Sequence, residues 1–304
     1  MKLGARHLLT LSELTPKELA TLLRRASRLK SDLKNGRRHE TLRCKSLVMV
    51  FQKPSTRTRV SFEIGMRQLG GHAVNLATSE MQLSRGETVE DTARTLSGYA
   101  DCVMARVYEH ETIERLAAHS DIPVINGLSD MFHPCQILAD LMTIKERKKK
   151  LDGLRIAWVG DGNNVCNSMI YGAALAGASV AVATPKRHAP DKDVVREACR
   201  DTEVVQTTDP NIAVKGADVV MTDTFSSIHN KGAGRAKAFL PRYQVNRKLM
   251  DKADQDAIFM HCLPAKRGQE VTADVIDGPQ SAVWDEAENR LHAQKALLEA
   301  LIRK

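Results

Sequence analysis

Short apolar runs recur along the chain, and segments of helical periodicity lie between them. The clearest run, 46–51, is followed by a helical pattern over 58–69 that stops at Gly70-Gly71. An apolar run this short is typical of a strand that is buried on both faces. Strands that alternate with helices indicate a parallel sheet covered by helices on both sides.

The same alternation continues to the end of the chain. Thr15-Pro16-Lys17-Glu18 is a capping box with proline at the first helical position, so an amphipathic helix is expected to begin there. Further strands are expected at 73–76, 102–106, 123–126, 155–160, 179–183, 204–206, 219–222 and 258–261, and further helices at 137–144, 167–175 and 287–302. The basic run 145–150 favours a solvated helix end or a connector. The pattern therefore predicts an α/β protein of two domains that meet near residues 148–152.

Composition narrows the classes of function. The 304 residues carry 45 Lys and Arg against 37 Asp and Glu, a net charge of +8, which favours an anionic partner such as a nucleic acid, a membrane or a phosphorylated metabolite. Aromatic residues make up only 4% and do not interleave with basic ones, so a stacking platform for single-stranded nucleic acid is not expected. No apolar run approaches the roughly 20 residues that span a bilayer. The six cysteines form no C-x-x-C pair, which favours reduced thiols in a cytoplasm over a disulfide or zinc framework.

The first candidate site is Ser55-Thr56-Arg57-Thr58-Arg59, between a predicted buried strand and a helix. The first turn of a helix has unpaired N–H groups and a partial positive charge, and hydroxyl and guanidinium groups add donors that match phosphate oxygens. The alternative is an ordinary cap with two surface arginines. A Walker loop is excluded because the chain has no G-x-x-x-x-G-K-[ST] motif.

Two further motifs follow predicted strands. In His133-Pro134-Cys135-Gln136, an imidazole and an amide at a helix start can hydrogen-bond a polar carbonyl group, or His133 is structural and Cys135 only packs. His261-Cys262-Leu263-Pro264 comes at a strand end, where α/β folds bind ligands. Its thiol is either reactive or inert. Asp223 also follows a strand, so a carboxylate near that thiol is expected.

Gly160-Asp161-Gly162-Asn163-Asn164 suggests a dinucleotide site but does not complete the motif. Val165 replaces the third glycine, and Thr184-Pro185-Lys186 stands where an acidic residue would end the next strand. The incomplete motif speaks against a nicotinamide-dependent oxidoreductase, which stays a rival interpretation. The two asparagines are candidates for binding a small polar ligand.

In this order, the four motifs resemble the aspartate/ornithine carbamoyltransferase family. His261-Cys262-Leu263-Pro264 is similar to its ornithine branch, since the aspartate branch has proline in place of the cysteine. Further matches are Gln82 with Arg85-Gly86-Glu87, Arg106, Asn164, Asp223, Tyr243-Gln244-Val245 and Glu286-Ala287-Glu288-Asn289-Arg290. The resemblance implies two doubly wound parallel-sheet domains, a carbamoyl phosphate-binding one at 1–148 and an ornithine-binding one at 149–286, with a C-terminal helix at 287–304 that returns to the first domain.

The resemblance also implies a reaction, in which the side-chain amine of L-ornithine attacks carbamoyl phosphate and gives L-citrulline and phosphate. It implies a cytoplasmic enzyme of arginine biosynthesis without cofactor, metal, nucleic-acid or membrane partner, and a homotrimer in which Gln82 comes from an adjacent subunit. The implied carbamoyl phosphate ligands are Ser55, Thr56, Arg57, Thr58, Gln82, Arg106, His133, Gln136, Cys262, Leu263 and Arg290. The implied ornithine ligands are Asn164, Asp223, Ser227 and Ile228. Arg57, Arg106, His133, Asp223 and Cys262 are the implied catalytic residues, with Asp223 and a Cys262 thiol or thiolate at the amine.

The chain departs from the family pattern at two places. Ser227-Ile228-His229 stands where ornithine enzymes carry Ser-Met-Gly, and Gln52 replaces the usual glutamate before Lys53. A putrescine-using relative also lacks Ser-Met-Gly, so another amine such as putrescine is an alternative acceptor. A nucleic-acid-binding module and an inactive regulatory relative are further alternatives.

Overall fold

The computed structural model describes residues 3–225 and 234–303, apart from the side chains of Glu80 and Ser84. It contains two compact units. Unit 1 comprises Met1–Ala139 and Asn289–Lys304, and unit 2 comprises Asp140–Glu288. The first boundary falls within one helix and the second within another. The domain limits proposed at residues 148 and 286 stay a prediction, because compact units and domains need not coincide.

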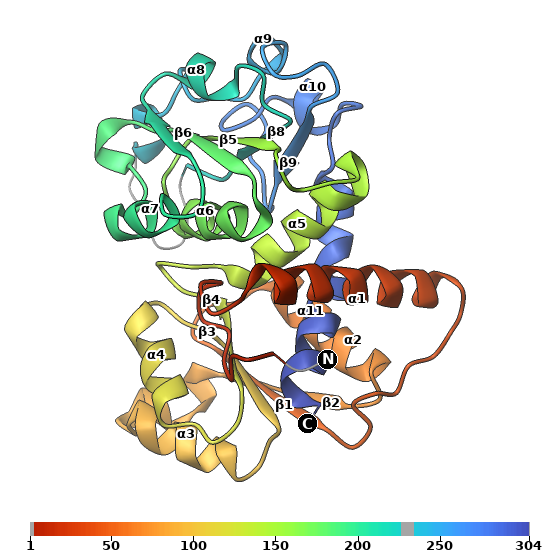
Figure 1. The fold of residues 1–304 in the computed structure, drawn as a ribbon. Coiled ribbons are helices and arrows are strands. Elements are labelled where there is room, and N and C mark those ends of the chain that lie inside the picture. The colour runs from red at the N-terminus through yellow and green to blue at the C-terminus, as the bar shows by residue number, and fades with distance from the viewer. Residues whose placement is uncertain (1–2, 226–233, 304) are drawn as a thin grey trace. The chain divides into compact units, whose positions relative to one another are not determined.

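Unit 1 is built on a four-stranded parallel sheet with the order β2-β1-β3-β4 (Figure 1). Its strands are β1 (Ser46–Phe51), β2 (His72–Ala77), β3 (Cys102–Arg106) and β4 (Val124–Leu128). Its helices are α1 (Pro16–Lys34), α2 (Thr56–Gln68), α3 (Val89–Ser97), α4 (His110–Ala118), the start of α5 (Pro134–Lys148) and most of α11 (Val283–Ile302), with short 3-10 turns at Thr78–Glu80 and Gln82–Arg85.

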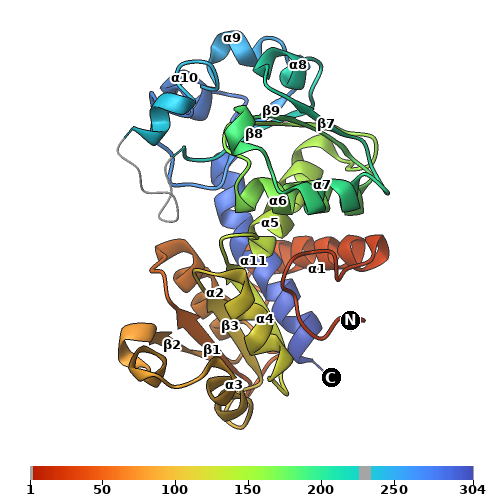
Figure 2. The same cartoon turned by 90° about the vertical axis from the view of Figure 1, so that its left-hand side faces the viewer.

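Helices cover the sheet of unit 1 on both faces. α3 and α4 pack on one face through Leu96, Ile113 and Leu116, which cluster with Val48, Val50 and Val103 of the sheet (Figure 2). The alternate residues Leu47, Met49 and Met104 are also fully buried and point to the opposite face. Because α11 belongs largely to unit 1, the C-terminal helix packs back on the first unit, as predicted.

Unit 2 has a five-stranded parallel sheet with the order β7-β6-β5-β8-β9. Its strands are β5 (Arg155–Val159), β6 (Ser179–Ala183), β7 (Val204–Thr207), β8 (Val219–Thr222) and β9 (Ile258–His261). Besides the rest of α5 and α11, its helices are α6 (Asn164–Ala176), α7 (Lys192–Ala198), α8 (Pro210–Val214), α9 (Arg247–Met250) and α10 (Ala273–Ile276). Short 3-10 turns lie at Lys186–His188 and Arg235–Ala238. Figure 1 shows α8, α9 and α10 on one side of this sheet and α6 and α7 on the other. The predicted class, α/β with two doubly wound parallel sheets, is confirmed.

Both sheets contain a point at which the strand order reverses. This point lies between β1 and β3 in unit 1 and between β5 and β8 in unit 2. In open parallel sheets, ligands bind beyond the carboxyl ends of the strands at such a reversal. The fold therefore directs attention to the segments that follow these four strands. Within the described residues, no helix is long and apolar enough to span a membrane.

Candidate active site

The phosphate motif lies at the start of α2, directly after β1. We predicted a helix from residue 58, but α2 begins at Thr56, because the Ser55 hydroxyl caps it by accepting a hydrogen bond from the Thr58 N–H at 3.3 Å. Thr56, Arg57 and Thr58 therefore form the first helical turn. Positive helix-dipole charge and the Arg57 guanidinium act together here, which suits an anion.

Arg106 comes to the same edge of the sheet from β3. It is the last residue of that strand and pairs in register with Phe51, and its carbonyl accepts from the Gln52 N–H at 2.9 Å. The adjacent Lys53 is fully buried, with its ammonium 4.4 Å from the centre of the Tyr108 ring. Burial above all, and then the Arg106 charge, lower the Lys53 pKa to about 8. Sequence reasoning quoted Lys53 without giving it a role, since its burial beside Arg106 was not visible.

His133 brings an uncharged imidazole to this group of cations. We predicted that α5 begins at residue 137, but it begins at Pro134, because proline has the backbone angle of a first helical residue and lacks the N–H that would be unpaired there. His133 is buried just before this turn. Burial above all, and then the charges of Arg290, Arg106 and Arg57, hold the His133 pKa well below its usual value. The imidazole is therefore neutral near pH 7.

Arg290 ties three distant segments of unit 1 together. From α11 it donates to Gln136 Oε1 at 2.5 Å and to Thr58 Oγ1 at 3.3 Å. All three side chains are buried. The predicted residues Arg57, Thr58, Arg106, His133, Gln136 and Arg290 thus gather at the reversal point of this sheet. We call them the unit 1 cluster.

Cys135 and Gln82 do not belong to the cluster. Cys135 is buried and its thiol donates to the Asn126 carbonyl at 3.4 Å, so it packs as expected. Gln82 begins an exposed 3-10 turn. In the described part of unit 1, the Gln82 side chain makes no hydrogen bond to the cluster.

In unit 2, Asp223 lies directly after β8 and contacts the segments that follow β5 and β9. Its Oδ2 accepts from Asn163 Nδ2 at 2.7 Å, and its Oδ1 accepts from the Cys262 thiol at 3.3 Å. We call Asp223, Asn163 and Cys262 the unit 2 cluster. The carboxylate expected near the Cys262 thiol is therefore Asp223, whereas Asn164, a predicted ornithine ligand, is the buried first residue of α6.

Sequence reasoning named Asn163 only as one of two candidate asparagines and missed its role as a helix cap, although that signal is readable in the sequence. We expected α6 to begin at residue 167, but Asn163 Oδ1 accepts from the N–H groups of Val165 at 3.0 Å and Cys166 at 3.2 Å. Asparagine is a strong helix cap, so the helix begins at Asn164. The capping geometry leaves the Asn163 amide nitrogen directed at Asp223.

Cys262 is a thiol and not a thiolate in this environment. Burial raises its pKa well above the usual value, and the carboxylates of Asp223, Glu286 and Asp140 raise it further. Both effects favour the thiol form of Cys262 over the thiolate, a choice that the sequence left open. Cys262 donates a hydrogen bond, and Asp223 is the proton acceptor of this pair.

Buried polar contacts fix the loop that carries Cys262. His261 Nδ1 accepts from the Leu263 N–H at 2.9 Å, so the ring proton is on Nε2, which lies 3.4 Å from Glu270 Oε1. The backbone N–H of His261 donates to Glu286 Oε2 at 2.9 Å. Leu263 has a left-handed backbone with φ of 58°, which a branched residue rarely adopts. These contacts hold Leu263 in that conformation.

Asp223, His261 and Cys262 bring three ligand-type atoms within 4.8 Å of one another. Asp223 and Cys262 are hydrogen-bonded to each other, and His261 Nδ1 accepts from Leu263. A metal ion would have to displace these contacts, so we assign no metal to this cluster.

The glycines of the Gly160-Asp161-Gly162 segment are explained by packing. A Cβ atom at Gly162 would lie 2.3 Å from Pro190 N and 2.6 Å from the His188 carbonyl oxygen, and Gly160 has φ of 133°. The turn at residues 188–190 therefore requires glycine at 162 without any bound cofactor. The remaining predicted ornithine ligands, Ser227 and Ile228, lie outside the described residues.

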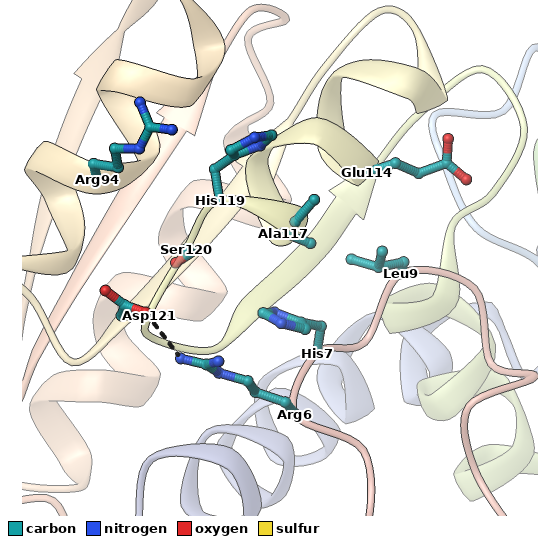
Figure 3. Close-up of a pocket in the computed structure, with 10 residues that line it drawn as sticks. Arg6, His7, Leu9, Arg94, Glu114, Ala117, His119, Ser120 and Asp121 are labelled. Carbon is teal, nitrogen blue, oxygen red and sulfur yellow. Dashed lines mark ion pairs between the residues drawn. The ribbon is translucent and has the colours of Figure 1, made fainter.

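A surface hollow of about 800 Å³ lies elsewhere in unit 1 (Figure 3). Its charged groups include Arg6, which approaches Asp121 to 3.9 Å. The residues that line it include none of the predicted site residues. The hollow therefore does not bear on the two clusters.

Comparison with known proteins gives one consistent answer. Residues 6–146 match the model of the aspartate/ornithine carbamoyltransferase carbamoyl-P binding domain, and residues 152–301 match that of the Asp/Orn binding domain. A relative from Cenarchaeum symbiosum named ornithine carbamoyltransferase is 62% identical over 302 residues, 99% of each chain. A relative from Pyrococcus furiosus named ornithine carbamoyltransferase, anabolic, is 50% identical over 98% of this chain and 96% of that one.

Solved structures agree. Ornithine carbamoyltransferase from Pyrococcus furiosus has a TM-score of 0.93 at 50% identity and covers 99% of this chain and 98% of its own. The enzyme from Thermus thermophilus has a TM-score of 0.90 at 43% identity, with 98% and 99% covered. On these matches, which span both units, the chain belongs to the aspartate/ornithine carbamoyltransferase family.

Proposed function

We propose that the chain transfers the carbamoyl group of carbamoyl phosphate to the side-chain amine of L-ornithine, giving L-citrulline and phosphate. The observation that carries the proposal is the unit 1 cluster, where three arginines surround the neutral His133 and Arg57 lies in the first turn of α2. The names of the reported relatives support ornithine as the acceptor.

The unit 1 cluster is suited to a leaving phosphate. Arg57, Arg106 and the start of α2 would hold its oxygens and accept the charge that grows as the C–O bond breaks, with Ser55 and Thr56 as further donors. Preorganised donors of this kind are often the largest catalytic contribution, and loss of one typically costs about 2.7–4 kcal/mol.

The carbamoyl group would bind beside the phosphate. A neutral imidazole can donate to the carbonyl oxygen without adding a competing charge, so His133 would polarise that oxygen together with Thr58 and Arg106. Gln136 and the Leu263 carbonyl would orient the NH₂ group. Arg290 holds Gln136 and Thr58 in place and would contact the same ligand.

The unit 2 cluster is suited to the amine. Asp223 would bind the ammonium form and accept the proton that must leave before the nitrogen attacks the carbamoyl carbon. The departing phosphate would take the second proton after the N–C bond forms. Cys262, as a thiol, would orient Asp223 through its hydrogen bond and contact the carbamoyl end of the ligand. Asn164, Ser227 and Ile228 would hold the amino-acid end.

The alternative acceptor, putrescine, gains no support from the reported relatives, which are all named for ornithine. The relative named anabolic supports a role in arginine synthesis. The cytoplasmic location stays a prediction.

We also propose a homotrimer with active sites shared between subunits. Exposed Gln82 and three exposed apolar side chains support it, Val60 and Ile64 on α2 and Val74 on the edge strand β2. Apolar side chains beside an unpaired sheet edge are typical of a protein interface.

A direct acceptor assay tests the proposed function. The chain is incubated with carbamoyl phosphate and equal concentrations of L-ornithine, putrescine or Nα-acetylornithine, and each ureido product is measured by mass spectrometry. Loss of a charge-assisted contact to the α-carboxylate costs about 1.5–3 kcal/mol, so citrulline should form about 10- to 150-fold faster than the putrescine product. Equal or faster reaction of putrescine would contradict the assignment.

A further inference from the structure

Arg235 of unit 2 joins the chain segment that carries Asn163 to the segment that carries Asp223. Its Nη2 donates to Asp161 Oδ2 at 2.6 Å, and its Nε donates to the Phe225 carbonyl at 3.2 Å. Asp161 lies two residues before Asn163, and Phe225 lies two residues after Asp223. One guanidinium therefore links the segments whose side chains form the Asn163–Asp223 hydrogen bond.

The Asp161 end of this link is buried and strongly held. Burial raises the Asp161 pKa, and the hydrogen bond and charge of Arg235 oppose that rise. His188 Nδ1 lies 3.6 Å from the other carboxylate oxygen, and the Trp158 indole donates to the Asp161 carbonyl at 2.9 Å. Removal of the Arg235 charge would leave a buried carboxylate without its closest cation.

The Phe225 end is packed against aromatic rings. Phe225 stacks on Phe239 with ring centres 4.6 Å apart, and His188 contacts the same Phe239 ring at 4.7 Å. The Arg235 guanidinium carbon lies 5.9 Å from that ring centre. Phe225 and Phe239 are fully buried, so the position of the Phe225 backbone depends on a rigid set of contacts.

We propose that Arg235 is a positioning residue that sets acceptor binding by holding Asp223 against Asn163. The proposal rests on the proposed function, because Asp223 must be the residue that receives the amine. Arg235 itself touches no reacting atom. A planar guanidinium is required because its Nε and Nη2 serve two acceptors at once, which a lysine ammonium does not reproduce in the same geometry.

Kinetics of three variants test the proposal. Arg235→Gln should raise KM for ornithine by about 10- to 100-fold, since small misplacement of a binding group is costly, while KM for carbamoyl phosphate changes less than about threefold. Arg235→Lys keeps the charge, so it should be about as stable as the wild type. Its KM for ornithine should lie between that of the wild type and that of Arg235→Gln. Arg247→Gln is the matched control, because Arg247 forms an exposed ion pair with Asp251 at 3.0 Å and should leave both KM values unchanged.

A double variant separates positioning from stability. Arg235→Gln alone leaves Asp161 buried and uncompensated, so it is expected to unfold at a lower urea concentration. Asp161→Asn combined with Arg235→Gln removes that charge and should restore the urea midpoint, yet KM for ornithine should stay raised because the link to Phe225 is still absent. Recovery of KM in the double variant, or an equal rise of both KM values in Arg235→Gln, would overturn the proposal. A wild-type chain that forms no citrulline would instead refute the proposed function, and this inference with it.

Discussion

His292 makes the stability of unit 1 depend on pH in a way that can be calculated. It lies on α11 and is 1% exposed. Burial above all, and then the charges of Lys295, Lys30 and Lys34, lower its pKa from 6.5 to about 3. The unfolded chain therefore binds a proton at pH values where folded His292 does not, so stability is complete above about pH 6.5 and falls as the pH drops toward 3.

The size of this effect follows from the two pKa values. Each pKa unit corresponds to about 1.4 kcal/mol, so His292 protonation favours the unfolded state by about 2 kcal/mol at pH 5. The neighbouring Lys295 does not contribute to this change, because burial lowers its pKa only to about 8. Between pH 7.5 and pH 5, the wild type should therefore lose about 2 kcal/mol more free energy of unfolding than His292→Gln does.

Urea unfolding at a series of pH values measures this difference. The free energy of unfolding is obtained for the wild type, His292→Gln and the control His72→Gln, whose side chain is exposed on β2. The control should have the same pH slope as the wild type. A His292→Gln slope identical to that of the wild type would refute the assignment of a buried neutral histidine.

Two further predictions concern the sites. Cys262→Ser should lower the rate of citrulline formation by about 10- to 100-fold, because the thiol orients Asp223, with little change in carbamoyl phosphate affinity. Weaker carbamoyl phosphate binding in calorimetry with a nearly unchanged rate would exclude this role. If active sites are shared, Gln82→Ala and Asp223→Asn chains that are each inactive should regain activity when they are mixed, dissociated and reassociated. Mixtures as inactive as the separate chains would speak against sharing.

Much of the fold was predictable because each strand is a short run buried on both faces. The limits of β3, β6, β8 and β9 match the predicted strands residue for residue. Helix starts were less accurate, since Ser55 and Asn163 cap their helices and Pro134 begins one. Each of these starts moves motif residues into the first helical turn.

The sites were predictable only in part. Residues near a strand end, such as Arg57 and Asp223, follow from the position of ligand sites in parallel sheets. Arg290 comes from a distant helix, so only the family resemblance assigned it to the same ligand as Gln136, and their hydrogen bond was not foreseen. The contacts of Arg235 and Lys53 depend on burial between segments far apart in sequence, which no local pattern encodes.

The central claim is that a doubly negative ligand binds at the start of α2, and calorimetry of carbamoyl phosphate tests it most directly. Arg57→Ala should weaken binding by about 100- to 1,000-fold, the equivalent of about 2.7–4 kcal/mol. Arg59→Ala is the matched control, because Arg59 lies on the same helix in an exposed ion pair with Glu63 at 3.6 Å. It should bind like the wild type. Near-normal affinity of the Arg57→Ala variant would contradict the account.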